Sequence, residues 1–207
     1  MKLRQMNTRP LMVATLMIAT TLLATPSGAS DGETAYATLA AGCFWCIEAD
    51  LEKVEGVISV TSGYTGGTVA NPTYKQVSAG KTGHTEAVRV VFDPRIISYE
   101  ELLKTFWRNI DPTAADRQFC DIGEQYRAGI FYHNEGQREA AERSRAVLEQ
   151  TKSFANPIVT EITAATAFYP AEAYHQDYSK KYPIRYSYYR KRCGRDHRLK
   201  ELWGGKQ

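Results

Sequence analysis

Cysteine and aromatic residues come together early in the chain, in the run Gly42-Cys43-Phe44-Trp45-Cys46. We expect Cys43 to stand where a strand gives way to the N-terminus of a helix. The free N–H groups and the dipole at such a terminus stabilise a thiolate, which is the reactive form of cysteine. Cys43 is therefore a candidate nucleophile. Phe44 and Trp45 could form a cage for a small apolar group beside the sulfur, or could simply belong to the core.

A carboxyl group supplies a second chemical signal. In the strand expected over residues 84–92, alternation places Glu86 on the same face as the apolar Val88, Val90 and Phe92. Burial on an apolar face raises the pKa of a carboxyl group, so Glu86 could stay protonated and act as a general acid. The alternative is that Glu86 lies at the end of the strand and reaches water.

The cysteine pattern favours redox chemistry over metal binding. The chain has four cysteines, and the Cys43–Cys46 spacing of one helical turn suits a redox pair. Zinc sites usually need two close pairs, whereas Cys120 and Cys193 are single and far apart in the sequence. We therefore expect neither a metal nor another cofactor.

These groups must be positioned by short strands and helices with long loops between some of them. Strands are predicted over residues 35–41, 57–63, 84–92, 128–132 and 158–162. Helices are predicted over residues 43–54, 98–111, 135–150 and 171–178. The alternation predicts an α+β fold, a two-layer sandwich with a mixed sheet, a ferredoxin-like core and long functional loops. The main loop is expected over residues 64–82.

Residues 1–29 have the features of a secretory signal peptide. They contain three basic residues and no acidic one, an uncharged run from Leu11 to Ala24, and the small residues Ser27 and Ala29. The run is shorter than the roughly 20 apolar residues of a membrane span. We expect cleavage after Ala29, a single domain over residues 30–207, no stable membrane anchor, and export, most simply to the periplasm.

Charge is unevenly distributed. The chain has a net charge of +3, and the three basic residues of the leader account for it, which argues against a nucleic-acid partner. The tail from Lys180 to Lys200 nevertheless holds nine basic residues against one acidic residue. We interpret this tail as a solvated surface segment. A second interpretation is that its charge activates Cys193.

Several short motifs follow one another in a fixed order along the chain. They are Gly42-Cys43-Phe44-Trp45, Gly63-Tyr64-Thr65-Gly66-Gly67, Asn71-Pro72-Thr73-Tyr74, Gly83-His84-Thr85-Glu86-Ala87, Gln125-Tyr126-Arg127 and Tyr174-His175-Gln176-Asp177-Tyr178. Together they resemble the peptide methionine sulfoxide reductase A family, over about residues 36–190. The resemblance implies thiol-dependent reduction of (S)-methionine sulfoxide in oxidised proteins and peptides.

The chemistry of that reaction explains the residue types. A sulfoxide sulfur is electrophilic only when its oxygen is protonated or strongly hydrogen-bonded, so a thiolate and an acid are both needed. By resemblance, Cys43 attacks the sulfur and becomes a sulfenic acid, while Glu86 supplies the proton. Tyr74 and Tyr126 match family tyrosines that hydrogen-bond the sulfoxide oxygen. Asp121 matches a further polar residue of the family site.

The resemblance also implies a pocket and a second thiol. Phe44 and Trp45 match the pocket that holds the methyl group. A resolving thiol must condense with the sulfenic acid, and Cys193 is the first candidate because the family often uses a C-terminal cysteine. Cys46, where many members have glycine, is the second candidate, and Cys120 is expected to be a packed thiol near the site. The family suggests a thioredoxin-like reductant and a monomer.

Two other functions remain open at this point. A thioredoxin-like disulfide oxidoreductase would use Cys43 and Cys46 and need no acid, although its usual Gly-Pro between the cysteines is Phe-Trp here. A secreted binding module would carry structural disulfides that resist mild reductant.

Overall fold

The computed structural model of this chain describes Met1 and residues 34–204. Apart from Met1, the expected leader lies outside the described residues. Among the described helices, none is both long and apolar enough to cross a bilayer.

The described residues form eight strands, seven α-helices and one short 3-10 helix. The strands are β1 (Ala35–Ala41), β2 (Val57–Thr65), β3 (Thr85–Phe92), β4 (Arg117–Gln118), β5 (Asp121–Ile122), β6 (Ala128–Tyr132), β7 (Glu161–Ala164) and β8 (Tyr169–Pro170). The helices are α1 (Phe44–Leu51), α2 (Tyr74–Ser78), α3 (Tyr99–Arg108), η1 (Glu124–Tyr126), α4 (Glu135–Thr151), α5 (Tyr178–Lys181), α6 (Pro183–Arg192) and α7 (Arg195–Trp203).

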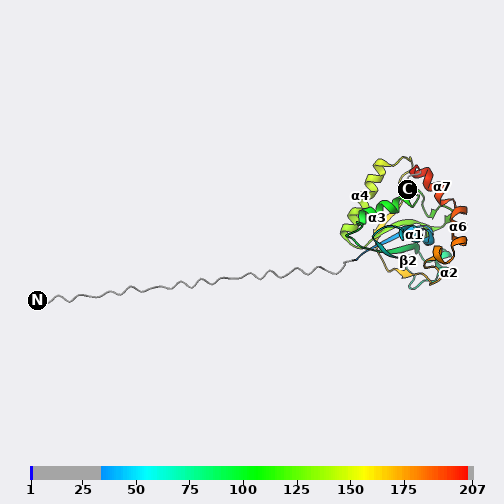
Figure 1. The fold of residues 1–207 in the computed structure, drawn as a ribbon. Helices are drawn as coiled ribbons and strands as arrows, with labels where there is room; N and C mark the ends of the chain where they lie inside the picture. Colours follow the sequence, from blue (N-terminus) through cyan, green and yellow to red (C-terminus); the bar gives the residue numbers. More distant parts are fainter. Residues whose placement is uncertain (2–33, 205–207) are drawn as a thin grey trace. The chain divides into compact units, whose positions relative to one another are not determined.

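Six strands form one sheet in the order β7-β6-β1-β3-β2-β8. Figure 1 shows these strands together with the labelled helices, coloured along the sequence. All neighbouring strands are antiparallel except β6 and β7, which makes the sheet mixed. The four central strands, with α1 and α3 as connections, follow the β-α-β-β-α-β order of a ferredoxin-like unit. The predicted α+β class with a mixed sheet is confirmed.

The main hydrophobic core lies on one face of this sheet. Leu39 and Val90 from the strands pack in it with Ile47 of α1 and Phe106 of α3. A smaller cluster around Phe131 lies apart from this core. Alternation along β3 therefore places every second side chain on the side of α1, where the catalytic candidates begin.

Capping residues decide where several helices begin. Ser98 starts α3 with the predicted capping box, and the Asn134 side chain caps α4 as expected. A further capping box, between Thr73 and Gln76, starts α2. This helix lies inside the loop predicted over residues 64–82, and the Thr-x-x-Gln spacing was the signal that could have revealed it.

Most predicted elements are present with small shifts. β1 and β6 have the predicted bounds, and β2, β3, α3 and α4 differ from prediction by at most three residues at either end. α1 ends at Leu51, three residues before the predicted end at Val54, because the chain turns at the C-cap residue Glu52.

The strand predicted over residues 158–162 begins instead at Glu161. The Val159 backbone N–H donates to the carbonyl of Pro112 at 2.8 Å, and the Thr160 hydroxyl donates to the same carbonyl at 3.4 Å. These residues are therefore tied to the segment after α3, and pairing with β6 starts only beyond them.

The helix predicted over residues 171–178 was wrong. Gln176 hydrogen-bonds both the N–H and the carbonyl of Ser62 at 2.9 Å, so its side chain continues the edge of β2. Asp177 then adopts a left-handed conformation with φ 53°, which interrupts any helix. Only the four residues of α5, from Tyr178, are helical here.

The core packing predicts a clear contrast between two helical isoleucines. Ile47 of α1 is 0% exposed, whereas Ile184 of α6 is 87% exposed. Ile47→Ala should lower the free energy of unfolding by about 2–5 kcal/mol. Ile184→Ala, the matched control, should change it by less than about 0.5 kcal/mol. Urea denaturation of the two variants measures both effects, and equal losses would contradict the core assignment.

Candidate active site

One cavity of about 270 Å³ collects the side chains for which the sequence predicted chemistry. It is lined by Cys43, Phe44, Trp45, Tyr74, Glu86, Asp121, Tyr126, Arg185 and Tyr189. The predicted nucleophile, acid, hydrogen-bond donors and pocket walls thus meet in one place. Arg185 and Tyr189 were not predicted to be there. Cys46 and Cys193, the candidate resolving thiols, lie outside the lining.

The turn from β1 into α1 places Cys43 at the N-terminus of α1. Cys43 is the N-cap residue of α1, as predicted. Gly42 before it has φ +76°, and a Cβ there would lie 2.4 Å from Cβ of the buried Gln118. Only glycine fits this position, so the step from strand to helix depends on its missing side chain.

Glu86 points from β3 toward the start of α1 and is 2% exposed. Its Oε2 accepts a hydrogen bond from the Phe44 N–H at 3.0 Å. Burial raises the pKa of Glu86 to about 8; the Phe44 N–H opposes this shift and the nearby Asp121 carboxyl adds to it. Glu86 is therefore protonated at neutral pH, and the alternative that it reaches water was wrong.

Cys43 and Cys46 are both free and buried. Burial, followed by the hydrogen bond between the two thiols, raises the pKa of Cys43 well above its ordinary value. The first N–H of α1 is engaged by Glu86, so the helix terminus does not stabilise a Cys43 thiolate as we expected. The hydrogen bond from Cys43 and the charge of Arg195 lower the pKa of Cys46.

Tyr74 reaches the cavity from the first residue of α2. Its backbone N–H donates to Glu172 Oε1 at 2.8 Å, and its ring lies 4.4 Å from the ring of His175. His175 in turn accepts a hydrogen bond from the Trp45 indole N–H at 3.0 Å. Burial raises the pKa of Tyr74 to about 12, so its hydroxyl remains a proton donor at neutral pH.

Tyr126 comes from η1, which its neighbours hold in place. The Gln125 amide donates to the Ser78 carbonyl at 3.1 Å, and Arg127 donates to the Gly83 carbonyl at 3.1 Å. The Gln-Tyr-Arg motif thus fixes Tyr126 against the end of α2 and the loop that precedes β3. Burial raises the pKa of Tyr126 above its ordinary value, so it also carries a proton.

Asp121 lines the cavity together with Tyr189, which the sequence analysis did not predict. Its Oδ2 accepts a hydrogen bond from the Tyr189 hydroxyl at 2.5 Å, and Tyr189 lines the same cavity as Cys43. Burial raises the pKa of Asp121, while the Tyr189 hydroxyl opposes that shift. Tyr182, Tyr186 and Tyr189 recur at helical spacing in the tail, and this was the signal that could have placed Tyr189 on one face of a helix.

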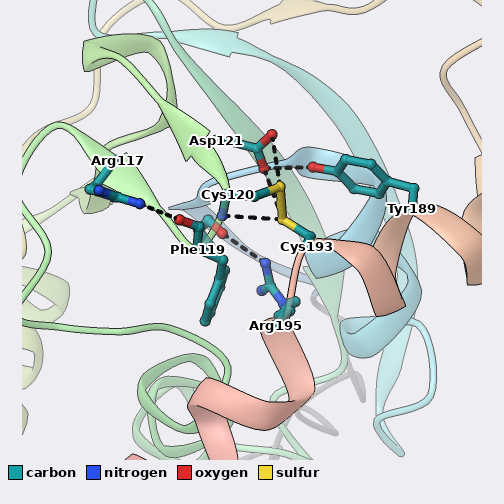
Figure 2. The surroundings of a disulfide bond; sticks show 8 residues. Arg117, Phe119, Cys120, Asp121, Tyr189, Cys193 and Arg195 are labelled. Atoms are coloured by element: carbon teal, nitrogen blue, oxygen red, sulfur yellow. Dashed lines mark hydrogen bonds between the residues drawn. A yellow bond between two sulfur atoms is a disulfide. The ribbon is translucent and has the colours of Figure 1, made fainter.

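A disulfide joins Cys120 to Cys193 beside Asp121, as Figure 2 shows. Cys120 lies in the turn between β4 and β5, and Cys193 ends α6. The expectation that Cys120 is a packed thiol was wrong, because its side chain is exposed and bonded. The two cysteines that stand 73 residues apart in the sequence are neighbours in the fold.

The basic tail is more than a solvated surface. Arg195 is 1% exposed, and its guanidinium donates to the carbonyls of Ala41 at 3.2 Å and Asn109 at 2.7 Å. Arg190 forms an ion pair with Asp50 of α1 at 2.8 Å. Our interpretation of the tail as a surface segment was therefore wrong for these residues, since they attach α6 and α7 to the elements of the site.

Comparison with known families agrees with this geometry. The family model described as peptide methionine sulfoxide reductase matches residues 35–207. The chain belongs to the peptide methionine sulfoxide reductase family.

Relatives within this family are similar over most of the chain. A peptide methionine sulfoxide reductase MsrA of Bacillus licheniformis is 51% identical over 82% of this chain and 94% of its own length. The MsrA/MsrB protein of Vibrio cholerae is 55% identical over 81% of this chain, which spans 44% of that longer protein.

Solved structures of peptide methionine sulfoxide reductases share the fold. Mxr1 from Saccharomyces cerevisiae in reduced form matches with a TM-score of 0.69 and 32% identity, over 72% of this chain and 86% of that chain. Methionine sulfoxide reductase A of Corynebacterium diphtheriae matches with a TM-score of 0.66 and 32% identity, over 75% of this chain and 78% of that chain.

The raised pKa of Glu86 predicts a pH-dependent cost to stability. Between its ordinary value of 4.5 and about 8, the unfolded chain releases this proton while the folded chain keeps it, so stability falls as pH rises. Glu86→Gln removes this dependence and keeps the acceptor for the Phe44 N–H. The variant should gain stability relative to the unmodified protein from pH 4.5 to about 8, and no more above that. Urea denaturation across this range measures the difference, and a difference that does not change with pH would contradict a buried acid.

Proposed function

We propose that this protein reduces (S)-methionine sulfoxide in proteins and peptides to methionine, with Cys43 as the nucleophile. One observation carries the proposal. The Cys43 thiol, a protonated Glu86 and two tyrosine hydroxyls line the same 270 Å³ cavity. A sulfoxide needs this combination, because its sulfur accepts a nucleophile only while its oxygen is hydrogen-bonded or protonated.

Glu86 is the general acid. Its pKa of about 8 leaves it protonated at neutral pH but still able to release the proton when negative charge develops on the sulfoxide oxygen. Tyr74 and Tyr126 donate hydrogen bonds to the same oxygen. Glu86 is buried, and donors that are shielded from bulk solvent stabilise the transition state more strongly than they would in water.

Cys43 must lose its proton before it attacks. Cys46 ionises more readily than an ordinary cysteine, and its thiolate, which neighbours Cys43, can take up that proton as the Cys43 sulfur attacks. Attack by the Cys43 sulfur breaks the sulfoxide S–O bond, transfers the oxygen to Cys43 as a sulfenic acid and releases methionine. Phe44 and Trp45 form the apolar wall against which the methyl group of the substrate packs.

A second thiol then displaces the sulfenic oxygen as water. Cys46 is the proposed first resolving thiol, because it is already hydrogen-bonded to Cys43. Cys193, the first candidate from the sequence, is joined to Cys120 in this structure. We therefore propose that it acts after Cys46. A thioredoxin-like protein is the proposed reductant of the last disulfide.

The rival function, a disulfide oxidoreductase that uses Cys43 and Cys46, gives no role to Glu86. Thiol–disulfide exchange has no substrate oxygen to protonate, whereas Glu86 shares its cavity with the Cys43 thiol and two tyrosines that can hydrogen-bond such an oxygen. The position of Glu86 therefore favours the reductase. A monomer without a stable membrane anchor remains our proposal for the mature form.

Single-turnover assays test the function directly. Pre-reduced protein is mixed anaerobically with a methionine sulfoxide peptide, and methionine is counted by mass spectrometry. The unmodified protein should form at least one methionine per chain, and Cys43→Ser should form none. Glu86→Gln should react about 10²–10⁴-fold more slowly, while Glu55→Gln at an exposed position serves as the control. Methionine formation by the Glu86 variant at the rate of the unmodified protein would contradict the role of Glu86 as the general acid.

The leader and periplasmic location are a separate proposal, which rests on the sequence pattern of residues 1–29. Expression of the full chain in a bacterium with two membranes should give a periplasmic protein that begins at Ser30. Ala29→Phe should block cleavage, because the peptidase accepts only small residues there. N-terminal sequencing of the fractions provides the measurement. Recovery of uncleaved protein in the cytoplasm would contradict export.

A further inference from the structure

The active-site cavity has room for one side chain of a substrate but not for a folded segment of it. Its volume of about 270 Å³ lies below the range of about 300–1,000 Å³ that holds a drug-sized ligand. A methionine sulfoxide side chain that reaches Cys43 therefore fills this cavity. The backbone of the substrate and the residues that flank the sulfoxide stay at its rim. The residues of the rim can consequently distinguish one oxidised segment from another.

Arg185 is the charged residue of this rim. Among the described residues that line the cavity, it is the one basic side chain. Arg185 is exposed, whereas Tyr189, which lines the same cavity one turn later in α6, is partly buried. Residues four apart lie on the same face of a helix. Tyr189 therefore reaches the inner wall at Asp121, while Arg185 lies nearer to the solvent at the opening.

The charge of Arg185 is not used to hold the fold together. Arg190 of the same helix forms ion pairs with Asp50 at 2.8 Å and with Asp196 at 2.7 Å. In the part of the chain that the structure describes, no carboxylate forms an ion pair with Arg185. A planar guanidinium offers pairs of N–H donors that match the two oxygens of a carboxylate. Arg185 is thus available to a carboxylate that arrives with the substrate.

The acidic groups near the cavity leave this charge in place. Glu86 is buried and, with a pKa of about 8, carries no charge at neutral pH. The Asp121 carboxyl group accepts the hydroxyl of Tyr189 at 2.5 Å. Glu124 is exposed at the start of η1 but does not line the cavity. Arg185 is therefore the lining group that attracts a carboxylate next to the sulfoxide.

We propose that Arg185 is a specificity-determining residue, which favours a methionine sulfoxide that has a carboxylate next to it in the substrate. This inference rests on the proposed function and adds a substrate preference to it. The carboxylate comes from an acidic residue beside the sulfoxide or from the end of a chain whose last residue is methionine sulfoxide. Arg185 binds only this flanking group and takes no part in the chemistry at Cys43.

Competition between two peptides tests this preference. Both peptides, at equal concentration, are mixed with the same protein and a chemical dithiol, and mass spectrometry follows the methionine formed from each. The ratio of the initial rates is then the ratio of the two kcat/KM values. One pair of peptides carries Asp or the isosteric Asn beside methionine sulfoxide. The other pair ends in methionine sulfoxide, with a free carboxylate or an amide. The two pairs separate the two sources of the carboxylate.

The unmodified protein should prefer the carboxylate-bearing peptide in at least one pair, and that pair identifies the source. The preference should be about 2–5-fold, because ion pairs at exposed positions are weak. Arg185→Gln should remove the preference, and Arg185→Glu should reverse it. An increase in salt from about 0.1 M to about 1 M should weaken it, because the Debye length falls from about 10 Å to about 3 Å.

Lys191→Glu is the matched control. Lys191 is exposed on the same helix and does not line the cavity, so this variant changes the net charge of the protein as Arg185→Glu does. It should keep the preference of the unmodified protein. The Asn peptide serves as a second control, because Arg185 acts on the flanking charge. This neutral peptide should therefore react at similar rates with the unmodified protein and with every variant.

The outcomes separate the inference from the proposed function. Equal rates within both pairs for the unmodified protein would overturn the inference. A preference that persists in Arg185→Glu, or that Lys191→Glu reverses equally, would also overturn it, because the net charge or another residue would then be responsible. Failure of the unmodified protein to reduce even the neutral Asn peptide would instead overturn the proposed function.

Discussion

The hydrogen bond from the Phe44 N–H to the Glu86 carboxyl connects the two halves of the site. It joins the first turn of α1 to β3 and makes Glu86, the proposed acid, a neighbour of Cys43, the proposed nucleophile. The bond uses one of the free N–H groups at the start of the helix. Burial, followed by the hydrogen bond with the Cys46 thiol, raises the pKa of Cys43 and keeps its thiol protonated. Before substrate binds, the site holds a protonated carboxyl group and a protonated thiol. A sulfoxide sulfur becomes electrophilic only when its oxygen receives a hydrogen bond or a proton.

The other elements of the fold hold that pair in place. The ferredoxin-like sheet provides β1 and β3 side by side, so the strand before Cys43 and the strand of Glu86 share a register. Glu172 fixes Tyr74 from 98 residues later in the chain, and His175 fixes Trp45 from 130 residues later. These contacts position the Tyr74 backbone and the Trp45 indole before substrate arrives, and such prior ordering is the condition for electrostatic catalysis.

Local signals in the sequence were sufficient for the central part of this arrangement. Period-two alternation was enough to place Glu86 on the buried face of β3, and β1 had its predicted bounds. The Cys120–Cys193 bridge and the role of Tyr189 could not be predicted in the same way, because they depend on how a hairpin turn and a C-terminal helix meet. The segment before Tyr178 failed for a related reason, since Gln176 hydrogen-bonds the distant β2 in preference to its own helix. A side chain that pairs with the backbone of a distant strand, as Gln176 does, produces no periodic pattern in the sequence from which it could be predicted.

The buried Arg195 has a consequence for the order in which the molecule is completed. Its guanidinium bridges the ends of β1 and α3, which lie 154 and 86 residues earlier in the chain. Contacts of such long range are slow to form, because the intervening chain must be closed into a loop first. A growing chain would therefore possess its nucleophile early and gain the closure of the Cys43 turn only with its last helix. Chains that stop before α7 would be almost complete in length. They would still lack the Arg195 contacts to Ala41 and Asn109 that hold the Cys43 turn.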